Sequence, residues 1–96
     1  MADRPRRYEV ELTRAAEKEL ERLPGKVRNQ IGRTIKRLEE RYQAGERPQD
    51  IRPIEGRPGS FGIDSGEFRI LYEPDEAARL LTIWRIANRK DVYRNL

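Results

Sequence analysis

Apolar and polar residues along the first half of the chain predict one strand followed by two helices. Residues 8–12 alternate between polar and apolar with a period of two, which is typical of a half-buried strand. Thr13 is suited to cap a first helix, and Pro24-Gly25 is expected to end it. The short break predicts a helical hairpin. The second helix is indicated by apolar residues that recur every three or four positions, namely Val27, Ile31, Ile35, Leu38 and Tyr42.

The second half of the chain contains strand patterns separated by turn residues. Residues 46–60 hold three prolines and two glycines, and we expect them to form a connecting loop. The predicted strands cover residues 60–64, 68–72 and 80–87. The predicted turns are Asp64-Ser65-Gly66 and Pro74-Asp75. Helices followed by hairpin-linked strands are typical of an α+β fold, with antiparallel strands in a small sheet packed against the helices. The N-terminal strand is expected to join that sheet at an edge or as an inner neighbour.

Composition narrows the chemistry that the chain can perform. Its 96 residues suit one small domain, with residues 1–7 as a loose basic arm. The chain has no cysteine and no histidine, which excludes disulfides, thiolate nucleophiles, imidazole ligands and Ser-His-Asp triads. We therefore expect no metal and no cofactor. No apolar run approaches the roughly 18 residues of a membrane span, and the N-terminus lacks the apolar core of a signal peptide. We expect a cytoplasmic protein with no membrane partner.

The basic residues favour a nucleic-acid partner. The formal net charge is +4, and most of the cations are arginines, whose guanidinium forks match phosphate oxygens. Several cations and Tyr93 follow the last predicted strand, and Arg69 lies in the strand before it. If these two strands pair, Arg69 shares a face with the cations, and together they suit a phosphodiester. The predicted RNA-binding residues are Arg85, Lys90 and Arg94. The alternative is a solvated sheet face on which arginine stems cover apolar surface.

Two further features have competing interpretations. Arg33, Arg37 and Arg41 form a stripe on the second predicted helix, which suits a solvated face or a contact with ribosomal RNA. Trp84 lies within an apolar strand and is expected in the core, with a role as a stacking platform as the alternative.

Two segments, DSGEFRILY at residues 64–72 and RKDVYR at residues 89–94, carry a recognisable pattern. The order of the other segments agrees with it: a strand, a helical hairpin interrupted at Leu23-Pro24, an Ile54-Glu55-Gly56 step and closing strands. Over essentially its whole length the chain resembles the RelE/ParE toxin superfamily, which implies a single RelE-like toxin domain over residues 1–96. RelE-type members cut messenger RNA in the ribosomal decoding site without metal and are silenced by a cognate antitoxin.

The resemblance also implies the catalytic residues. Arg69 matches the strand arginine of the family, Arg89 the arginine after the last strand, and Tyr93 the C-terminal tyrosine. The two strand lysines of the family fall at Gly62 and Asp64, where this sequence departs from the pattern. Arginine stays protonated and cannot act as a base, so the two arginines suit charge stabilisation at a reacting phosphate. The base stays open between Tyr93, Lys90 and Asp64, although an aspartate before Ser-Gly is more often a turn residue.

Three functions follow as hypotheses. The first is the toxin of a type II toxin–antitoxin system, a RelE-like ribosome-dependent endoribonuclease in which the 2′-hydroxyl of the RNA attacks the adjacent phosphate. Its expected partners are a cognate antitoxin, in a hetero-oligomer, and the ribosome with its message. The second is a ParE-like toxin that inhibits DNA gyrase and cleaves nothing, which the missing lysines favour. The third is an inert member that only binds an antitoxin or RNA.

Overall fold

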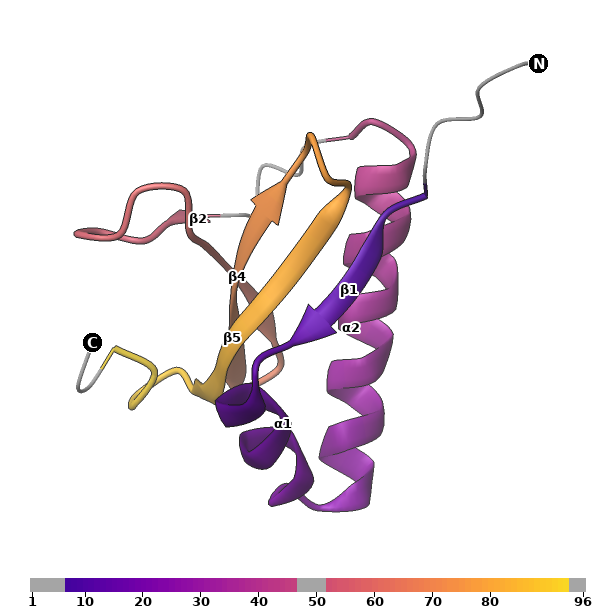
Figure 1. The fold of residues 1–96 in the computed structure, drawn as a ribbon. Helices are drawn as coiled ribbons and strands as arrows, with labels where there is room; N and C mark the ends of the chain where they lie inside the picture. The colour runs from indigo at the N-terminus through magenta and orange to yellow at the C-terminus, as the bar shows by residue number, and fades with distance from the viewer. Residues whose placement is uncertain (1–6, 47–51, 94–96) are drawn as a thin grey trace.

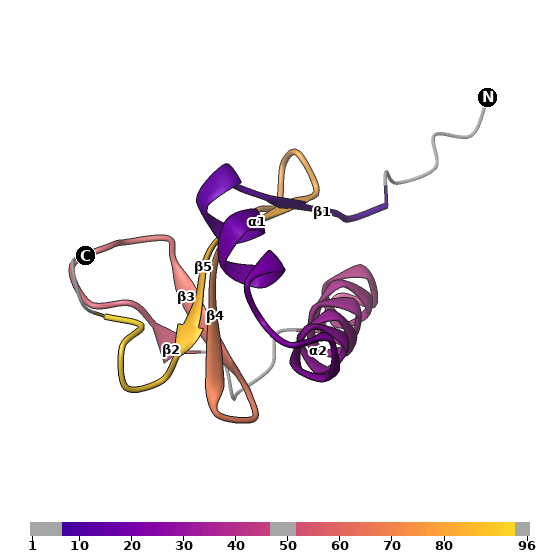
Figure 2. The same ribbon diagram turned by 90° about the horizontal axis from the view of Figure 1, so that it is seen from below.

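The computed structural model describes residues 7–46 and 52–93, which form a five-stranded sheet and two helices. The helices are α1 (Arg14–Glu21) and α2 (Gly25–Gln43), and the strands are β1 (Glu9–Leu12), β2 (Arg52–Pro53), β3 (Phe61–Ser65), β4 (Phe68–Asp75) and β5 (Leu80–Asn88). Figure 1 shows α2 running along the sheet. Figure 2 shows both helices on one side of the sheet and the segment after β5 on the other. The fold is α+β, as predicted.

Two limits apply to the ends of this description. Apart from the exposed Arg7, the predicted basic arm at residues 1–7 lies outside the described residues. Within residues 7–46 and 52–93, neither helix has the length and apolar character needed to cross a membrane.

The sheet is mixed, with strand order β1-β5-β4-β3-β2. Strands β2 to β5 pair antiparallel with one another, as predicted for β3, β4 and β5. β1 lies at the edge and runs parallel to β5, with Glu9 opposite Leu80 and Leu12 opposite Ile83. Tight turns force antiparallel pairing among β3, β4 and β5. No such turn links β1 to β5, so the direction of β1 in the sheet depends on how the helices that follow it pack.

Both helices form where the pattern predicts them and bury one stripe against the sheet. The Thr13 hydroxyl oxygen accepts a hydrogen bond from the Ala16 N–H at 3.2 Å, which caps α1 as expected. The apolar stripe of α2 faces the sheet, and its buried members are Ile31, Leu38 and Tyr42. The helical hairpin therefore covers one face of the sheet.

The turn between β3 and β4 is shorter than predicted. Asp64 and Ser65 belong to β3, and the loop consists of Gly66 and Glu67. Gly66 has a φ of +60°, which a type II′ hairpin turn requires at its first loop residue. This two-residue loop sets the register, with Asp64 opposite Arg69.

The predicted turn at Pro74-Asp75 is wrong, because both residues belong to β4. Pairing between β3 and β4 ends at Tyr72, so β4 has a neighbour only on the β5 side at Pro74. A proline without an N–H is tolerated in such an edge position. The chain instead turns over residues 76–79, where Arg79 adopts a φ of 55°.

The loop predicted over residues 46–60 contains the short strand β2. Arg52 lies opposite Gly62 and Pro53 opposite Phe61, which adds one more strand to the sheet edge. Residues 47–51 of the predicted loop lie outside the described residues. A strand of two residues is too short to show a period, and this explains why the sequence pattern does not reveal it.

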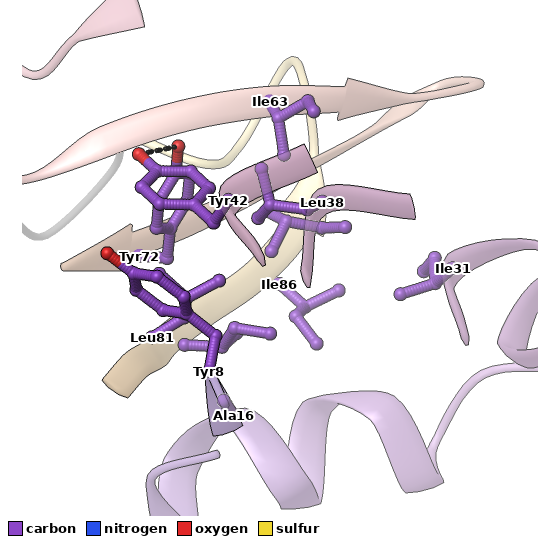
Figure 3. Packing of buried hydrophobic residues seen from close by; sticks show 11 residues of the cluster. Tyr8, Ala16, Ile31, Leu38, Tyr42, Ile63, Tyr72, Leu81 and Ile86 are labelled. Atoms are coloured by element: carbon purple, nitrogen blue, oxygen red, sulfur yellow. Dashed lines mark hydrogen bonds between the residues drawn. The ribbon is translucent and has the colours of Figure 1, made fainter. Parts of the chain in front are cut away.

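The main core lies between the sheet and the helices (Figure 3). Tyr42 on α2 and Tyr72 on β4 are both buried, and their hydroxyl oxygens lie 3.0 Å apart in a hydrogen bond. Tyr8 packs edge-on against Tyr42, with ring centroids 5.6 Å apart. These three rings are the aromatic members of a buried cluster whose other buried members are aliphatic.

A second, smaller cluster lies on the opposite face of the sheet. The tail cluster consists of the buried residues Ile54, Leu71 and Val92, with Trp84 and Ala87 packed against them. Consecutive side chains of a strand point to opposite faces, so β4 places Leu71 in the tail cluster and Tyr72 in the main core. In a register shift between β4 and β5, Leu71 lies opposite Arg85 whereas Tyr72 lies opposite Ile83, which leaves Trp84 as the extra residue on β5. Val92 is fully buried, so the tail cluster fixes the segment after β5 against the sheet.

Candidate functional site

The strand register brings charged residues together on the face of the sheet away from the helices. Ile63, Ile70 and Ile86 point into the main core, so their neighbours in sequence face the other way. On that outer face Asp64 lies opposite Arg69, and Arg69 lies opposite Ala87. The predicted strand arginine therefore lies beside the end of β5, where the chain continues to Arg89.

The three predicted catalytic residues meet in one network of contacts. Arg69 Nε donates to Asp64 Oδ1 at 2.6 Å, and Arg69 Nη1 donates to the Tyr93 hydroxyl oxygen at 2.7 Å. Arg89 Nη1 lies 3.6 Å from Asp64 Oδ2. Asp64, Arg69, Arg89 and Tyr93 are called the Asp64 cluster below. Arg69 and Arg89 thus lie on the same side of the molecule, close enough to contact one carboxylate together.

The charges of the Asp64 cluster shift its proton equilibria. The hydrogen bond from Arg69 lowers the pKa of Asp64 below its ordinary value of 3.8, and the positive charges of Arg69, Arg89 and Arg52 add to this against the opposing effect of burial. The hydrogen bond to Asp64 raises the pKa of Arg69 in turn. Asp64 is therefore ionised at neutral pH and is a weak proton acceptor, which disfavours it among the three candidate bases.

Local packing explains why Arg69 lies along β3. A Cβ added to Gly62 would lie 3.3 Å from Arg69 Cδ and 3.2 Å from Leu71 Cδ2, so the arginine stem crosses the glycine backbone closely. Any side chain at position 62 would push this stem away. Gly62 therefore gives the Arg69 stem the room to reach Asp64.

The segment after β5 is held by backbone contacts and by the tail cluster. The Arg89 N–H donates to the Glu67 carbonyl at 2.9 Å, which extends the pairing beyond β5. The Asn88 side-chain oxygen then accepts from the Lys90 N–H at 2.9 Å in a local turn. Burial of Val92 brings Tyr93, which is 46% exposed, back to Arg69.

A hollow adjoins the Asp64 cluster. It has a volume of about 380 Å³ and is called the Arg69 hollow; it is lined by Glu67, Arg69, Asn88, Arg89 and Lys90. Its lining presents three cations, a carboxylate and an amide, so it suits a polar, anionic ligand.

The predicted RNA-binding residues are placed differently from one another. Lys90 lines the Arg69 hollow. Arg85 lies on the same sheet face, but its Nη2 donates to the Asp91 carbonyl at 3.3 Å, so it supports the tail. Its buried Nε makes no hydrogen bond to any described residue. Arg94 lies outside the described residues.

The contacts of Asp64 and the presence of Glu67 and Asn88 in the hollow are not predicted by the sequence patterns. The position of the turn contains the information needed to predict the contact between Asp64 and Arg69. Once the loop is assigned to Gly66 and Glu67, counting residues away from the loop along both strands pairs Asp64 with Arg69. The charges at residues 64 and 69 would then predict a cross-strand ion pair.

Trp84 and the arginine stripe of α2 lie outside the Asp64 cluster. Trp84 packs half-buried against the tail cluster, and the Arg57 guanidinium lies 3.7 Å from the centre of its ring. Arg33 and Arg37 are exposed on α2. Among the described residues, no group of three or more acidic side chains gathers in a way that could hold a metal ion.

Comparison with known proteins connects this fold and site to a family. The family described as the ParE toxin of the type II toxin–antitoxin system parDE matches residues 10–93. No curated protein has a significant sequence match to the chain.

Several solved structures share the fold. A chain of the RelBE2 toxin–antitoxin complex from Mycobacterium tuberculosis matches with a TM-score of 0.69 and 24% identity, over 85% of this chain and 98% of that one. A chain of the archaeal RelE–RelB complex from Pyrococcus horikoshii OT3 matches at 0.68 and 21% identity, over 88% and 97%. The RelB–RelE complex from Methanococcus jannaschii contains a match at 0.63 and 25% identity, over 85% and 93%.

These structural matches agree with the element order and the sheet described above. The family match covers most of the chain, including the strands and the tail that carry Arg69, Arg89 and Tyr93. The chain therefore belongs to the ParE toxin family of type II toxin–antitoxin systems, within the RelE/ParE superfamily that its sequence resembles.

Proposed function

We propose that this chain acts as a RelE-like, ribosome-dependent endoribonuclease that cuts messenger RNA and so inhibits translation. The observation that supports this function is that Arg69 and Arg89, which line the Arg69 hollow, meet at Asp64, and that Arg69 also contacts Tyr93. Two guanidinium groups and one phenol within reach of one anion suit a phosphodiester.

The chemistry needs alignment and charge stabilisation. The 2′-hydroxyl oxygen of the RNA attacks the adjacent phosphorus, its proton passes to a base, and the 5′-oxygen of the next nucleotide leaves with a proton. The products are a 2′,3′-cyclic phosphate and a 5′-hydroxyl. Alignment of such an intramolecular nucleophile is worth roughly 7–11 kcal/mol. A donor aimed at the developing charge contributes on the order of 10²–10³ in rate, and this is the role of Arg69 and Arg89.

Tyr93 and Lys90 are the remaining candidates for proton transfer. The Tyr93 oxygen accepts a hydrogen bond from Arg69, so its own O–H is free to point toward a ligand. Lys90 lines the hollow beside Arg89. In this proposal Tyr93 contacts the reacting phosphate, while Lys90 and Arg85 contribute to RNA binding, Arg85 through the tail that it holds.

A cognate antitoxin is the second proposed partner. The similar chains from Mycobacterium tuberculosis and Pyrococcus horikoshii OT3 come from toxin–antitoxin complexes. The net charge of +4 suits an acidic chain that folds as it binds, in a cytoplasmic hetero-oligomer.

The alternative function is that of a ParE-like toxin that inhibits gyrase without cleavage, as the sequence resemblance allows; the matching family is described as a ParE toxin. Asp64 favours this alternative, because its carboxylate neutralises part of the charge of Arg69 and Arg89. A nuclease would be expected to carry cations at this position, as the resemblance implies.

A translating extract tests the proposal. The purified chain is added, and the 5′ ends of the messages are mapped. We expect cuts within codons for the wild type, few for Arg69→Ala or Arg89→Ala, and unchanged cutting for the control Arg14→Ala, which alters an exposed arginine on α1. Intact messages with all four proteins, together with inhibited DNA supercoiling by purified gyrase, would identify the alternative function instead.

A further inference from the structure

We propose that Asp64 is an internal counter-ion that occupies the place of a substrate phosphate between Arg69 and Arg89, and that a bound phosphodiester displaces it. This inference rests on the proposed function only in taking a phosphodiester as the ligand. It assigns Asp64 as a positioning residue that limits the affinity of the site for anions.

The contacts of Asp64 resemble those that an arginine pair makes to an anion. Its two oxygens are divided between two guanidinium groups, with Oδ1 2.6 Å from Arg69 Nε and Oδ2 3.6 Å from Arg89 Nη1. A carboxylate and a phosphate present acceptor oxygens of the same kind to such a fork. The carboxylate therefore engages donors that the phosphate also needs.

The Asp64 side chain can move without unfolding the protein. Its side chain is 44% exposed and that of Arg89 is 52% exposed, so both lie where an incoming anion can reach them. Arg69 is only 15% exposed, because its stem lies over Gly62. Arg69 is thus the fixed part of the cluster, and Asp64 and Arg89 are the parts that can rearrange.

Charge explains why the exchange matters. With Asp64 ionised, Asp64, Arg69 and Arg89 together carry one net positive charge, and with Asp64 neutral they would carry two. A phosphodiester must therefore compete with a carboxylate that is already in place, which lowers its affinity. A message held in place by the ribosome is presented at high effective concentration and can win this competition, whereas free RNA binds weakly.

The sequence supports a paired role for residues 62 and 64. Both lie on the outer face of β3, opposite Leu71 and Arg69. A glycine at 62 lets the Arg69 stem lie flat, and an aspartate at 64 binds its guanidinium. The two outer-face positions of β3 beside Arg69 thus hold one carboxylate and no cation, and this carboxylate is an ionic partner of the Arg69 guanidinium.

Asp64→Asn tests the proposal, because it keeps the shape of the side chain and removes its charge. The probe is a fluorescent RNA dinucleotide with a 2′-O-methyl group, which cannot be cleaved, and binding is followed by fluorescence anisotropy at low salt. We expect the variant to bind about three- to tenfold more tightly than wild type, which corresponds to about 0.65–1.4 kcal/mol for the loss of two competing exposed ion pairs. Asp64→Glu, which keeps the charge, is expected to bind as weakly as wild type.

Glu11→Gln is the matched control, because Glu11 is an exposed acidic residue on the outer face of the edge strand β1 and does not line the Arg69 hollow. It removes the same charge from the same face of the sheet, and we expect a change of less than about twofold. Equal or weaker binding by Asp64→Asn overturns the proposal. An equal gain from Glu11→Gln also overturns it, since the effect would then be one of general charge. Absence of binding in every protein overturns it as well.

Binding of an uncleavable probe separates this inference from the proposed function. Tighter binding by Asp64→Asn without any message cleavage would support the counter-ion and reject the nuclease. Message cleavage by the wild type with no gain in binding by Asp64→Asn would do the reverse.

Discussion

The sheet has an apolar face covered by α1 and α2 and an outer face that carries the Asp64 cluster. Buried side chains on the first face stabilise the fold, since each large one contributes about 1.5–3 kcal/mol. The outer face holds ion pairs that are half-exposed and worth about 0–1 kcal/mol each. Substitution of a charged residue on the outer face is therefore expected to cost much less stability than substitution of a buried residue on the first face.

The tail cluster links the two faces. Leu71 and Tyr72 are neighbours in β4, yet the first packs in the tail cluster and the second in the main core. Consecutive side chains of a strand point to opposite faces, and this explains the division. Small apolar contacts on the outer face thus position a charged site that ion pairs alone would hold weakly.

The largest expected effect on stability comes from the apolar face. Leu38 is 1% exposed in the main core, and Leu38→Ala should lower the free energy of unfolding by about 2–5 kcal/mol. Urea denaturation followed by circular dichroism measures this loss. A loss no larger than that of Asp64→Asn would mean that the apolar face does not dominate stability.

Arg69→Ala should lower cleavage strongly and stability only slightly, in contrast to Leu38→Ala, whose main effect is on stability. The free energy of unfolding should change by less than about 1 kcal/mol, since the lost pair is partly exposed, while message cleavage should fall by on the order of 10²–10³. Cleavage rates in a translating extract and urea denaturation together measure the two effects. If a folded Arg69→Ala variant cleaves messages at the wild-type rate, Arg69 does not take part in the reaction.

Val92→Ala tests whether the tail cluster positions the site. Val92 is fully buried, and loss of two methyl groups should cost about 1–2 kcal/mol of stability. Because Tyr93 follows it directly, cleavage should fall more than this global loss explains. A variant that is destabilised but cleaves at the wild-type rate would show that the tail needs no such anchor.

Tyr42→Phe should lower the free energy of unfolding less than Leu38→Ala does, and it alters only the apolar face of the sheet. It removes the hydrogen bond of 3.0 Å between the Tyr42 and Tyr72 hydroxyls and should cost about 1 kcal/mol. Thermal unfolding measures the change, and cleavage per folded molecule should stay constant. A drop in cleavage at full folding would connect this pair to the outer face.

The smallest effect concerns pH. The folded pKa of Asp64 lies below its ordinary value of 3.8, so its ion pairs stabilise the fold above that pH and lose this contribution as the pH falls through the lowered pKa. Wild type should be slightly more stable than Asp64→Asn at neutral pH, and the difference should vanish in strong acid. A difference that grows in acid would contradict the direction of the pKa shift.

Local patterns predicted most of the secondary structure. The stripe from Val27 to Tyr42 and the cap at Thr13 placed both helices, because these features depend on neighbours within a turn or two. The turn assigned to Pro74 failed, since a proline breaks a strand only where a partner on both sides needs its N–H. The strand at residues 52–53 could not be predicted from the sequence pattern, because only its pairing with β3 distinguishes it from a loop.

The sequence by itself determined which groups the protein can use: arginine guanidinium groups and a tyrosine hydroxyl, without imidazole or thiol. Only the tertiary structure decided that β1 runs parallel to β5, that Val92 anchors the tail, and that Asp64 lies between Arg69 and Arg89. Residue types and periods act over a few neighbours, whereas these contacts join segments far apart in the chain. They exist only once the burial of both faces has brought those segments together.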